Sequence, residues 1–281
     1  MRSNTILFGV ALCTLLACSD DAETSGTGGT GGTTSSSTTS SSGGTGGSGG
    51  DATPFGCVGS VAWPTASASS LQVAGNLSLV PGATPLSGVT VRACPKGDAV
   101  CTTPLDETVT ATDGRYSLTL PIAAVGFDGY LEVTGGSLIG DLVHYLPPLV
   151  ADANDHSFGE INLTTYDAYL AQAGLTRDPA RAQVAVTVLD CHRQPGNEIA
   201  LAVDTADGST VLGYDLGGAL DTAATATGVS GFAIFVNLPV GPATITASIA
   251  ATGEPVAEYV VTTRANFVSS LFLPPTPGTL P

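Results

Sequence analysis

The chain has 281 residues, of which 43% are hydrophobic and only 11% are charged, and its net charge is −16. With 24 acidic and 8 basic residues, it lacks the clustered Lys and Arg that bind nucleic acid or hold a protein on anionic lipid. Its 36 Gly and 18 Pro, together with so few charges, predict many short strands joined by turns rather than long helices.

The N-terminus has the composition of an export signal. Arg2 supplies a positive charge, and the apolar run over residues 6–16 is shorter than the ~20 residues that span a membrane. The run ends in LLAC at residues 15–18, which resembles the lipobox of bacterial lipoproteins. The resemblance implies a signal peptide over residues 1–17 and a lipid on Cys18. An ordinary signal peptide followed by a chance cysteine is the alternative.

The same resemblance predicts where the protein is held. It implies a diacylglyceryl group on the Cys18 sulfur and an acyl group on the new amino terminus, and two chains already anchor a protein stably. In enterobacteria, Asp after the lipidated cysteine retains a lipoprotein at the inner membrane, whereas Ser19 follows here. We therefore expect an exported protein, lipid-anchored to the cell envelope at the outer membrane, that contacts the membrane through this anchor only.

Residues 18–53 separate the anchor from the rest of the chain. The stretch from Thr24 to Gly50 contains only Thr, Ser and Gly. Such a tract has no apolar surface to offset the entropy lost on ordering. It predicts a disordered tether with a mean span of roughly 30 Å by random-coil scaling.

Residues 54–164 have the pattern of a first β-sandwich domain. Their number of alternating apolar runs and the spacing of their turns favour an antiparallel sandwich. A hairpin is predicted at 107–121, around the turn at Asp113-Gly114. The other expected strands lie at 71–79, 89–94, 129–133, 142–146 and 158–163.

Residues 165–181 interrupt the strand pattern and predict a helical connector. Thr165 can cap a helix, and Gly174 can end it. Tyr166, Tyr169 and Leu170 fall on one face of such a helix.

Residues 182–281 repeat the strand pattern and predict a second β-sandwich domain. GVSGFAIFVNLP at 228–239 echoes TDGRYSLTLP at 112–121. The two units are thus related repeats of about 110 residues, an ordinary domain size. Further strands are expected within 182–191, 194–204, 243–250, 256–261 and 266–273.

Four stretches resemble the carboxypeptidase regulatory-like family. They are GVTVRAC (88–94), TDGRYSLTLP (112–121), QVAVTVLDC (183–191) and SGFAIFVNLP (230–239). The resemblance implies an all-β chain of two transthyretin-like, Ig-like antiparallel sandwiches. It also implies a non-catalytic role, because members of this family are usually appendages for interaction, folding support or carbohydrate contact. The second unit departs from the pattern by lacking the Asp-Gly turn.

Four cysteines follow the tether, an even number that is typical of disulfides in an exported protein. Cys94 and Cys101 flank a short loop, so we expect them to pair. Cys57–Cys191 then follows by elimination. No His or second close Cys pair accompanies Cys94 and Cys101, so a zinc site is not expected.

One loop offers oxygen ligands for a cation. Asp152, Asn154 and Asp155 have a spacing that suits Ca²⁺ ligands in an extracellular loop, and Ca²⁺ is the only cofactor that the sequence suggests. The EF-hand pattern and its closing Glu are absent. We therefore favour a polar turn.

Three aromatic residues are candidates for stacking on sugar rings: Trp63, Tyr130 and Tyr145. Packing in the core is the favoured alternative for them. The sequence contains no HExxH or H-x-H motif. His156 and Glu160 stand four apart in a predicted strand, where we expect them to be solvated.

The sequence therefore predicts no catalytic residues and no enzyme. We expect a surface-anchored lipoprotein whose two domains serve protein interaction, adhesion or envelope structure, with an unknown envelope protein or glycan as partner. One alternative is a carbohydrate- or cell-wall-binding lipoprotein, and another is an accessory protein of an envelope enzyme. Lys–Asn isopeptide bonds of the pilin type are not expected, because each consumes a lysine and Lys96 is the single one.

Overall fold

The computed structural model describes residues 53–277. The predicted signal peptide, Cys18 and nearly all of the predicted tether lie outside the described residues. Within 53–277 the chain forms sixteen strands and one short helix, arranged in several sheets. The mostly β character expected from the composition is confirmed. No helix in this part of the chain has the length and hydropathy needed to cross a membrane.

The first half of the chain packs a small sheet against one end of a large sheet. The small sheet contains β1 (Ser70–Val80), β2 (Thr84–Pro85), β5 (Arg115–Pro121) and β8 (Phe158–Ile161). Facing it are β3 (Thr90–Pro95), β4 (Asp106–Val109), β6 (Gly129–Thr134) and β7 (Gly140–His144). The alternation that predicted β5 explains its packing, since Tyr116, Leu118 and Leu120 are buried while the residues between them are exposed.

The predicted hairpin at 107–121 is wrong. β4 pairs with β3 in the large sheet, whereas β5 pairs with β1 in the small sheet. The turn at Gly114 therefore carries the chain from one sheet to the other. Gly114 has a φ of +80°, and a Cβ there would lie 2.4 Å from the carbonyl oxygen of Leu77. Glycine is the residue that tolerates both conditions.

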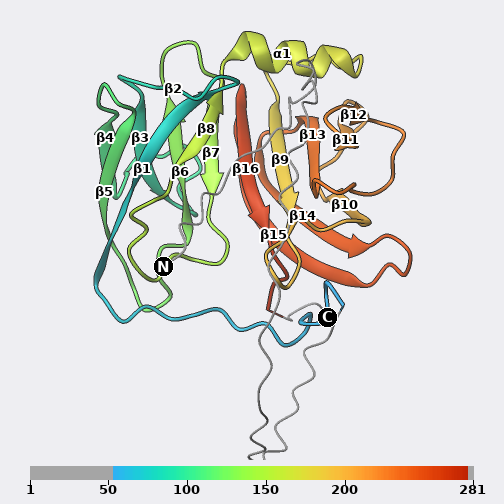
Figure 1. Ribbon diagram of the computed structural model, residues 1–281, viewed down its shortest axis with the longest axis horizontal. Coiled ribbons are helices and arrows are strands. Elements are labelled where there is room, and N and C mark those ends of the chain that lie inside the picture. The colour runs from blue at the N-terminus through green and yellow to red at the C-terminus, as the bar shows by residue number, and fades with distance from the viewer. Residues whose placement is uncertain (1–52, 278–281) are drawn as a thin grey trace, which may run out of the picture.

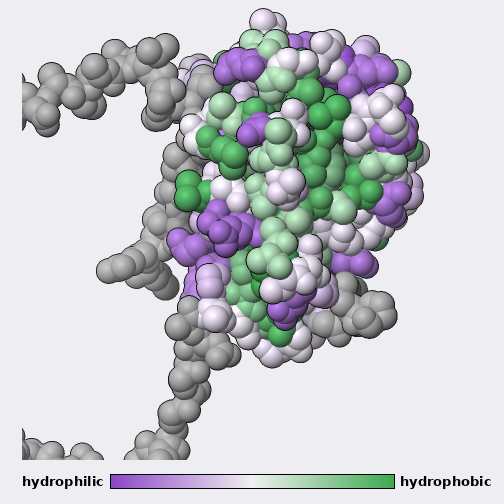
Figure 2. Space-filling model, turned by 90° about the vertical axis from the view of Figure 1, so that its right-hand side faces the viewer, coloured by the Kyte–Doolittle hydropathy of each residue, from purple (hydrophilic) through white to green (hydrophobic). Residues whose placement is uncertain are grey.

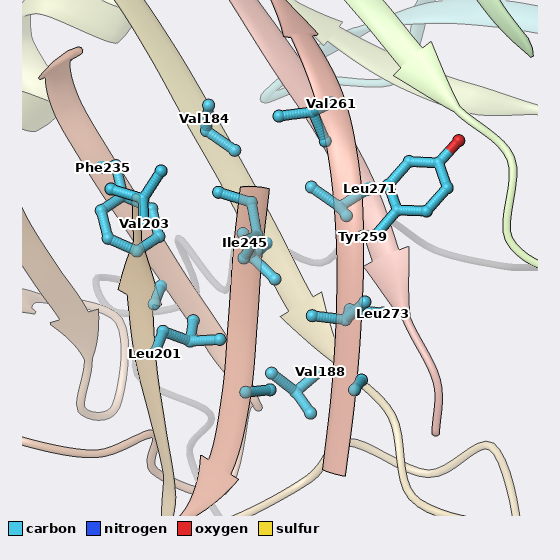
Figure 3. Packing of buried hydrophobic residues seen from close by; sticks show 14 of the residues in the cluster. Val184, Val188, Leu201, Val203, Phe235, Ile245, Tyr259, Val261, Leu271 and Leu273 are labelled. Atoms are coloured by element: carbon cyan, nitrogen blue, oxygen red, sulfur yellow. The ribbon is translucent and has the colours of Figure 1, made fainter. Parts of the chain in front are cut away.

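The second half builds a similar pair of layers. The other end of the large sheet contains β9 (Ala182–Val188), β11 (Val211–Asp215), β12 (Leu220–Asp221), β13 (Phe232–Leu238) and β16 (Phe267–Leu273). The sheet that faces it contains β10 (Ile199–Val203), β14 (Gly241–Ile249) and β15 (Pro255–Thr263). Figure 3 shows side chains from both sheets, among them Val184, Leu201, Ile245 and Leu271, packed in the core between them.

One nine-stranded sheet runs through both halves (Figure 1). Its order is β12-β11-β13-β9-β16-β7-β6-β3-β4. β16 joins the halves because it pairs in parallel with β9 on one side and with β7 on the other. The strand pattern predicted two separate antiparallel sandwiches, and this parallel pairing between the halves differs from that prediction. β1 and β8 are a further parallel pair.

The two smaller sheets cover opposite faces of the nine-stranded sheet. Val143 of β7 packs in the core between the large sheet and the small sheet of β1, β2, β5 and β8. Its neighbour His144 points to the other face, because successive strand residues alternate. His144 is the strand neighbour of Leu271 in β16. Leu271 packs in the core between the large sheet and the sheet of β10, β14 and β15. His144 also contacts Tyr259 of β15, with ring centroids 6.0 Å apart.

The helix α1 (Leu163–Gln172) lies along the top of the molecule in Figure 1, over β16 and β9. Its N-cap is Asn162 rather than the expected Thr165, since the Asn162 side chain accepts a hydrogen bond from the Thr165 amide. Gly174, at a φ of +70°, ends the helix as predicted. The predicted face, Tyr166, Tyr169 and Leu170, is buried.

Candidate functional site

A cavity of about 80 Å³ lies where the two halves meet, under α1. Side chains from β7, β8, β9, β13, β16 and α1 line it. Most of the wall is apolar, and it includes Ile139, Ile161, Phe232, Ile234 and Val268. Five side chains with polar atoms also line the cavity: Asp141, Glu160, Tyr166, Tyr169 and Ser270.

The parallel pairing of β7 and β16 places Asp141 beside Ser270. The Ser270 hydroxyl donates a hydrogen bond of 3.0 Å to Asp141 Oδ2. A Cβ at Gly140 would lie 2.3 Å from the ring of Phe267, so glycine lets the two strands approach at this point. Glu160 comes from β8 and Tyr166 from α1, so the polar side chains of the cavity come from both halves and the helix between them.

Several polar atoms of the cavity are buried without a partner. Asp141 Oδ1, Glu160 Oε1 and Tyr166 Oη have no hydrogen-bond partner within the described residues. Glu160 is 2% exposed and Tyr166 is 4% exposed. Buried polar atoms of native proteins are nearly always paired with protein or water. Three such atoms around one cavity are therefore unusual.

Burial also sets the protonation of the two acids. It raises the pKa of Asp141 to about 7, against the hydrogen bond from Ser270, which acts to lower it. Burial, and then the charge of Asp141, raise the pKa of Glu160 well above its usual range. None of the described side chains that line the cavity is basic. At least one of the two carboxyl groups is consequently protonated at neutral pH.

No family model matches the chain, and no curated protein matches it. Several solved structures are distantly similar. The shaft pilin SpaA of Lactobacillus rhamnosus GG is 15% identical, over 77% of this chain and 100% of the pilin, with a TM-score of 0.23. A streptococcal ancillary pilin is 10% identical, over 75% of this chain and 64% of the other, with a TM-score of 0.25. A DUF3823 family protein from Parabacteroides merdae is 13% identical, over 70% of this chain and 100% of the other, with a TM-score of 0.23.

These TM-scores are too low to carry any argument about what this chain does. The structure does define where the single lysine lies. Lys96 Nζ is 3.6 Å from Asp128 Oδ1 and 3.9 Å from the centre of the Tyr259 ring. Its amine is thus held by an ion pair and a cation–π contact.

Both expected cysteine pairs are bonded in the structure. Cys57–Cys191 ties the segment before β1 to the turn after β9, and Cys94–Cys101 closes the loop after β3. A carboxylate oxygen of Glu132 lies within 4.8 Å of both sulfurs of the second pair. Since these sulfurs are bonded to each other, they are not free to ligate a metal.

The loop proposed for Ca²⁺ packs against β1. The Gln72 amide donates a hydrogen bond of 2.8 Å to Asp152 Oδ1, and Ala153 forms a bridge with Val73. Among the described residues, no group of three acidic, His or Cys ligands includes Asp152 or Asp155. Asn154 lies in the turn of the same loop. The structure thus assigns this loop a structural role and leaves the Ca²⁺ site a prediction.

For two of the three candidate sugar-stacking residues, the favoured alternative of packing in the core is confirmed. Tyr130 is fully buried, and its hydroxyl donates a hydrogen bond to the Asp98 carbonyl. Tyr145 is 5% exposed and packs against Phe127 and His156. Both rings contribute to the interior, where no sugar can reach them.

Trp63 differs from these tyrosines because it is partly exposed. It lines a hollow of about 250 Å³ together with Pro64, Pro147, Pro275 and the Cys57–Cys191 disulfide. Trp63 is therefore the one aromatic candidate that remains accessible.

The histidines do not form a catalytic cluster in the described residues. Burial lowers the pKa of His144 to about 3 and that of His156 to about 4, so both rings are neutral at neutral pH. His192 is exposed, with Nδ1 3.7 Å from Asp190 Oδ2. Glu160, expected in solvent, is buried instead, because α1 and the second half cover its strand.

Sequence reasoning missed the pairing of Asp141 with Glu160. Each acid follows a glycine inside an otherwise apolar strand, in IGDLV and FGEIN. An acid in such a strand is a usable signal, since a charge at a core-facing position is rare without a role. The signal does not say that the two acids share a cavity.

Proposed function

We propose that the protein is a lipid-anchored component of the bacterial outer membrane whose folded head has a non-catalytic role in protein interaction, adhesion or envelope structure. In this proposal Cys18 carries the lipid, and residues 18–53 hold the head away from the membrane. The head comprises two transthyretin-like units, 54–164 and 182–281, which resemble carboxypeptidase regulatory-like domains, and residues 165–181 connect them.

The observation that carries this proposal is the nine-stranded sheet. Two domains on a flexible linker commonly move relative to each other and form a cleft between them. Here β16 is hydrogen-bonded to both β7 and β9, which supports a single stiff body. Such a body suits presentation or scaffolding better than it suits a reaction that requires opening and closing.

The chemistry of the side chains supports the same role. His144 is buried, His156 is half-buried, and both rings are neutral at neutral pH, whereas a general base must reach its substrate. Two disulfides are typical of proteins exported to an oxidising compartment.

The surface offers a feature suited to a protein partner. Figure 2 shows a band of apolar surface, bordered by polar residues, on the side of the molecule formed by β11 and β12. Leu216, directly after β11, is 46% exposed, and Val229, shortly before β13, is 81% exposed. A contiguous exposed apolar patch of this kind often marks an interaction site.

The anchor is tested with Cys18→Ala, and Ser19→Ala serves as the control that keeps the cysteine. The unsubstituted chain and the control are expected in the membrane fraction, with lipid mass on the N-terminal peptide. Cys18→Ala is expected without that mass and outside the membrane fraction. Equal membrane association of all three proteins would overturn the lipid anchor.

The interaction role is tested by cross-linking and capture from envelope material with the full chain. Leu216→Asp and Val229→Asp are expected to abolish capture of the partner. Val109→Asp is the control, since Val109 is 57% exposed and lies on β4, at the opposite end of the nine-stranded sheet. Equal capture by all variants would exclude this face.

Carbohydrate binding is the second candidate, and the exposed edge of Trp63 beside its hollow favours it. The test is a glycan array probed with the full chain and with Trp63→Ala. Binding that is lost in Trp63→Ala but kept in Val229→Ala would support a carbohydrate-binding protein. Glycan binding without any captured protein would replace the first candidate.

A further inference from the structure

The cavity under α1 combines features that recognise a specific class of small molecule. Asp141 Oδ1, Glu160 Oε1 and Tyr166 Oη are buried with no partner in the described residues, and all three residues line the cavity. The lining contains two acids and no base. A bound cation would supply the missing partner and the missing positive charge.

The rest of the wall argues against a metal ion. Ca²⁺ takes six to eight oxygen ligands, and Mg²⁺ requires near-ideal octahedral geometry. The lining side chains offer oxygens from Asp141, Glu160, Tyr166, Tyr169 and Ser270 only, and the Ser270 hydroxyl already donates to Asp141. Isoleucine, valine and phenylalanine cover most of the remaining surface.

An organic cation fits this combination better. An ammonium group has three N–H donors for acceptor oxygens, and an alkyl chain gains by contact with an apolar wall. The two tyrosines, Tyr166 and Tyr169, add aromatic surface, which also attracts ammonium groups. We propose that the cavity binds a small primary alkylammonium ion, with the ammonium group on Asp141 and Glu160 and the alkyl chain against the apolar wall.

The volume sets the size of the ligand. The cavity holds about 80 Å³, roughly half of the ~150 Å³ of an engineered cavity that binds benzene. The ligand therefore has about three or four non-hydrogen atoms, as in ethylammonium or propylammonium. A ligand this small binds with a dissociation constant on the order of 1 mM.

The binding should depend on pH. The ammonium group requires one ionised carboxylate, while the other, protonated carboxyl group offers it a carbonyl oxygen. Burial raises the pKa of Asp141 to about 7. The apparent affinity is therefore expected to fall about tenfold for each pH unit below neutral, where the acids take up protons.

The test is a titration of the full chain with propylammonium chloride, in which binding is measured by calorimetry and by ligand-observed NMR. The double variant Asp141→Asn/Glu160→Gln and the cavity-filling variant Ala185→Leu are expected to weaken binding at least tenfold. Glu254→Gln/Glu258→Gln removes the same number of charges from exposed positions and is expected to bind as the unsubstituted chain does. Near-ultraviolet circular dichroism confirms that each variant is folded.

Several results would overturn the proposal. Propanol, which has the same size but no charge, must bind at least tenfold more weakly than propylammonium. Equal binding of propanol would reduce the site to an apolar void. Saturable binding of CaCl₂ that Asp141→Asn/Glu160→Gln abolishes would make the site a metal site. If propylammonium binds all variants equally well, or binds neither the unsubstituted chain nor any variant, the cavity is occupied by water and the proposal is wrong.

Discussion

Replacement of Asp141 by Asn should stabilise the protein, although it removes a native hydrogen-bonding acid. Asp141 shares the cavity with Glu160 from β8, Tyr166 and Tyr169 from α1 and Ser270 from β16. The Ser270 hydroxyl donates a hydrogen bond to it. Arg177, near Tyr166, is already paired with Asp167 at 3.0 Å. The Asp141 carboxylate thus has no basic partner, and its ionised form is the costly one.

The magnitude follows from proton linkage. The pKa of Asp141 rises from an ordinary 3.8 to about 7 in the folded state. The folded protein therefore binds more protons than the unfolded chain between these values, and its stability falls as pH rises through that window. A difference of about three pKa units corresponds to about 4 kcal/mol at neutral pH. Asp141→Asn should recover most of this free energy there and little of it near pH 4.

Urea unfolding of both proteins across this pH range provides the measurement. Because His144 and His156 titrate equally in both proteins, the difference between the two curves reports Asp141 together with Glu160, whose pKa is raised in part by the charge of Asp141. Asp221→Asn, at an exposed position outside the cavity, is the control for the loss of one carboxylate. A free-energy difference that does not change with pH, or a variant that is less stable at neutral pH, would refute the proposed origin of the pKa shift.

Three further changes test other parts of the structure. The pKa of His144 is lowered to about 3 by burial, so stability is lost as pH falls from about 6.5 towards that value. His144→Phe should move acid unfolding, followed by circular dichroism, to lower pH; an unmoved midpoint would contradict this. Removing the Cys57–Cys191 link, which spans 134 residues, by double replacement with Ser should cost up to about 5 kcal/mol in denaturant unfolding. A loss of unfolding free energy below about 1 kcal/mol would mean that the disulfide does not restrict the unfolded chain. Arg264→Ala deprives Glu132, which is 4% exposed, of a partner and should cost about 3–5 kcal/mol in thermal unfolding. Glu132→Gln in that background should restore part of the loss, and no restoration would argue against the ion pair.

Local features of the fold were predictable, because their causes lie in neighbouring residues. The alternation of Tyr116, Leu118 and Leu120 revealed the buried face of β5. Gly174 revealed the end of α1, since a left-handed backbone conformation favours glycine. The N-cap was placed wrongly because Asn162 and Thr165 are both capping residues, and only the backbone conformation decides between them.

Features set by distant partners were not predictable in the same way. An apolar strand such as β16 carries no mark of which strands it pairs with, and both of its neighbours are parallel and far away in the sequence. The turn at Gly114 is compatible with a hairpin and with a change of sheet, and the structure contains the change.

The candidate site was partly visible in the sequence. An acid between apolar residues, as at Asp141 and Glu160, signals an unusual position. Whether it faces water or a cavity depends on what covers the strand, and here the cover is α1 together with the second half of the chain. The tyrosines failed as sugar-binding candidates for the same reason, because exposure is a property of the packed molecule.

The Cys57–Cys191 disulfide has a mechanical consequence. A pull on the N-terminus reaches Cys57 first and then passes through the sulfur bridge to Cys191, at the end of β9. The intervening chain, which includes the whole first half and α1, lies inside a covalent loop and bears none of the load. Opened, that loop would add roughly 450 Å of length for its 134 residues. While the bridge is intact, this length cannot be released by such a pull.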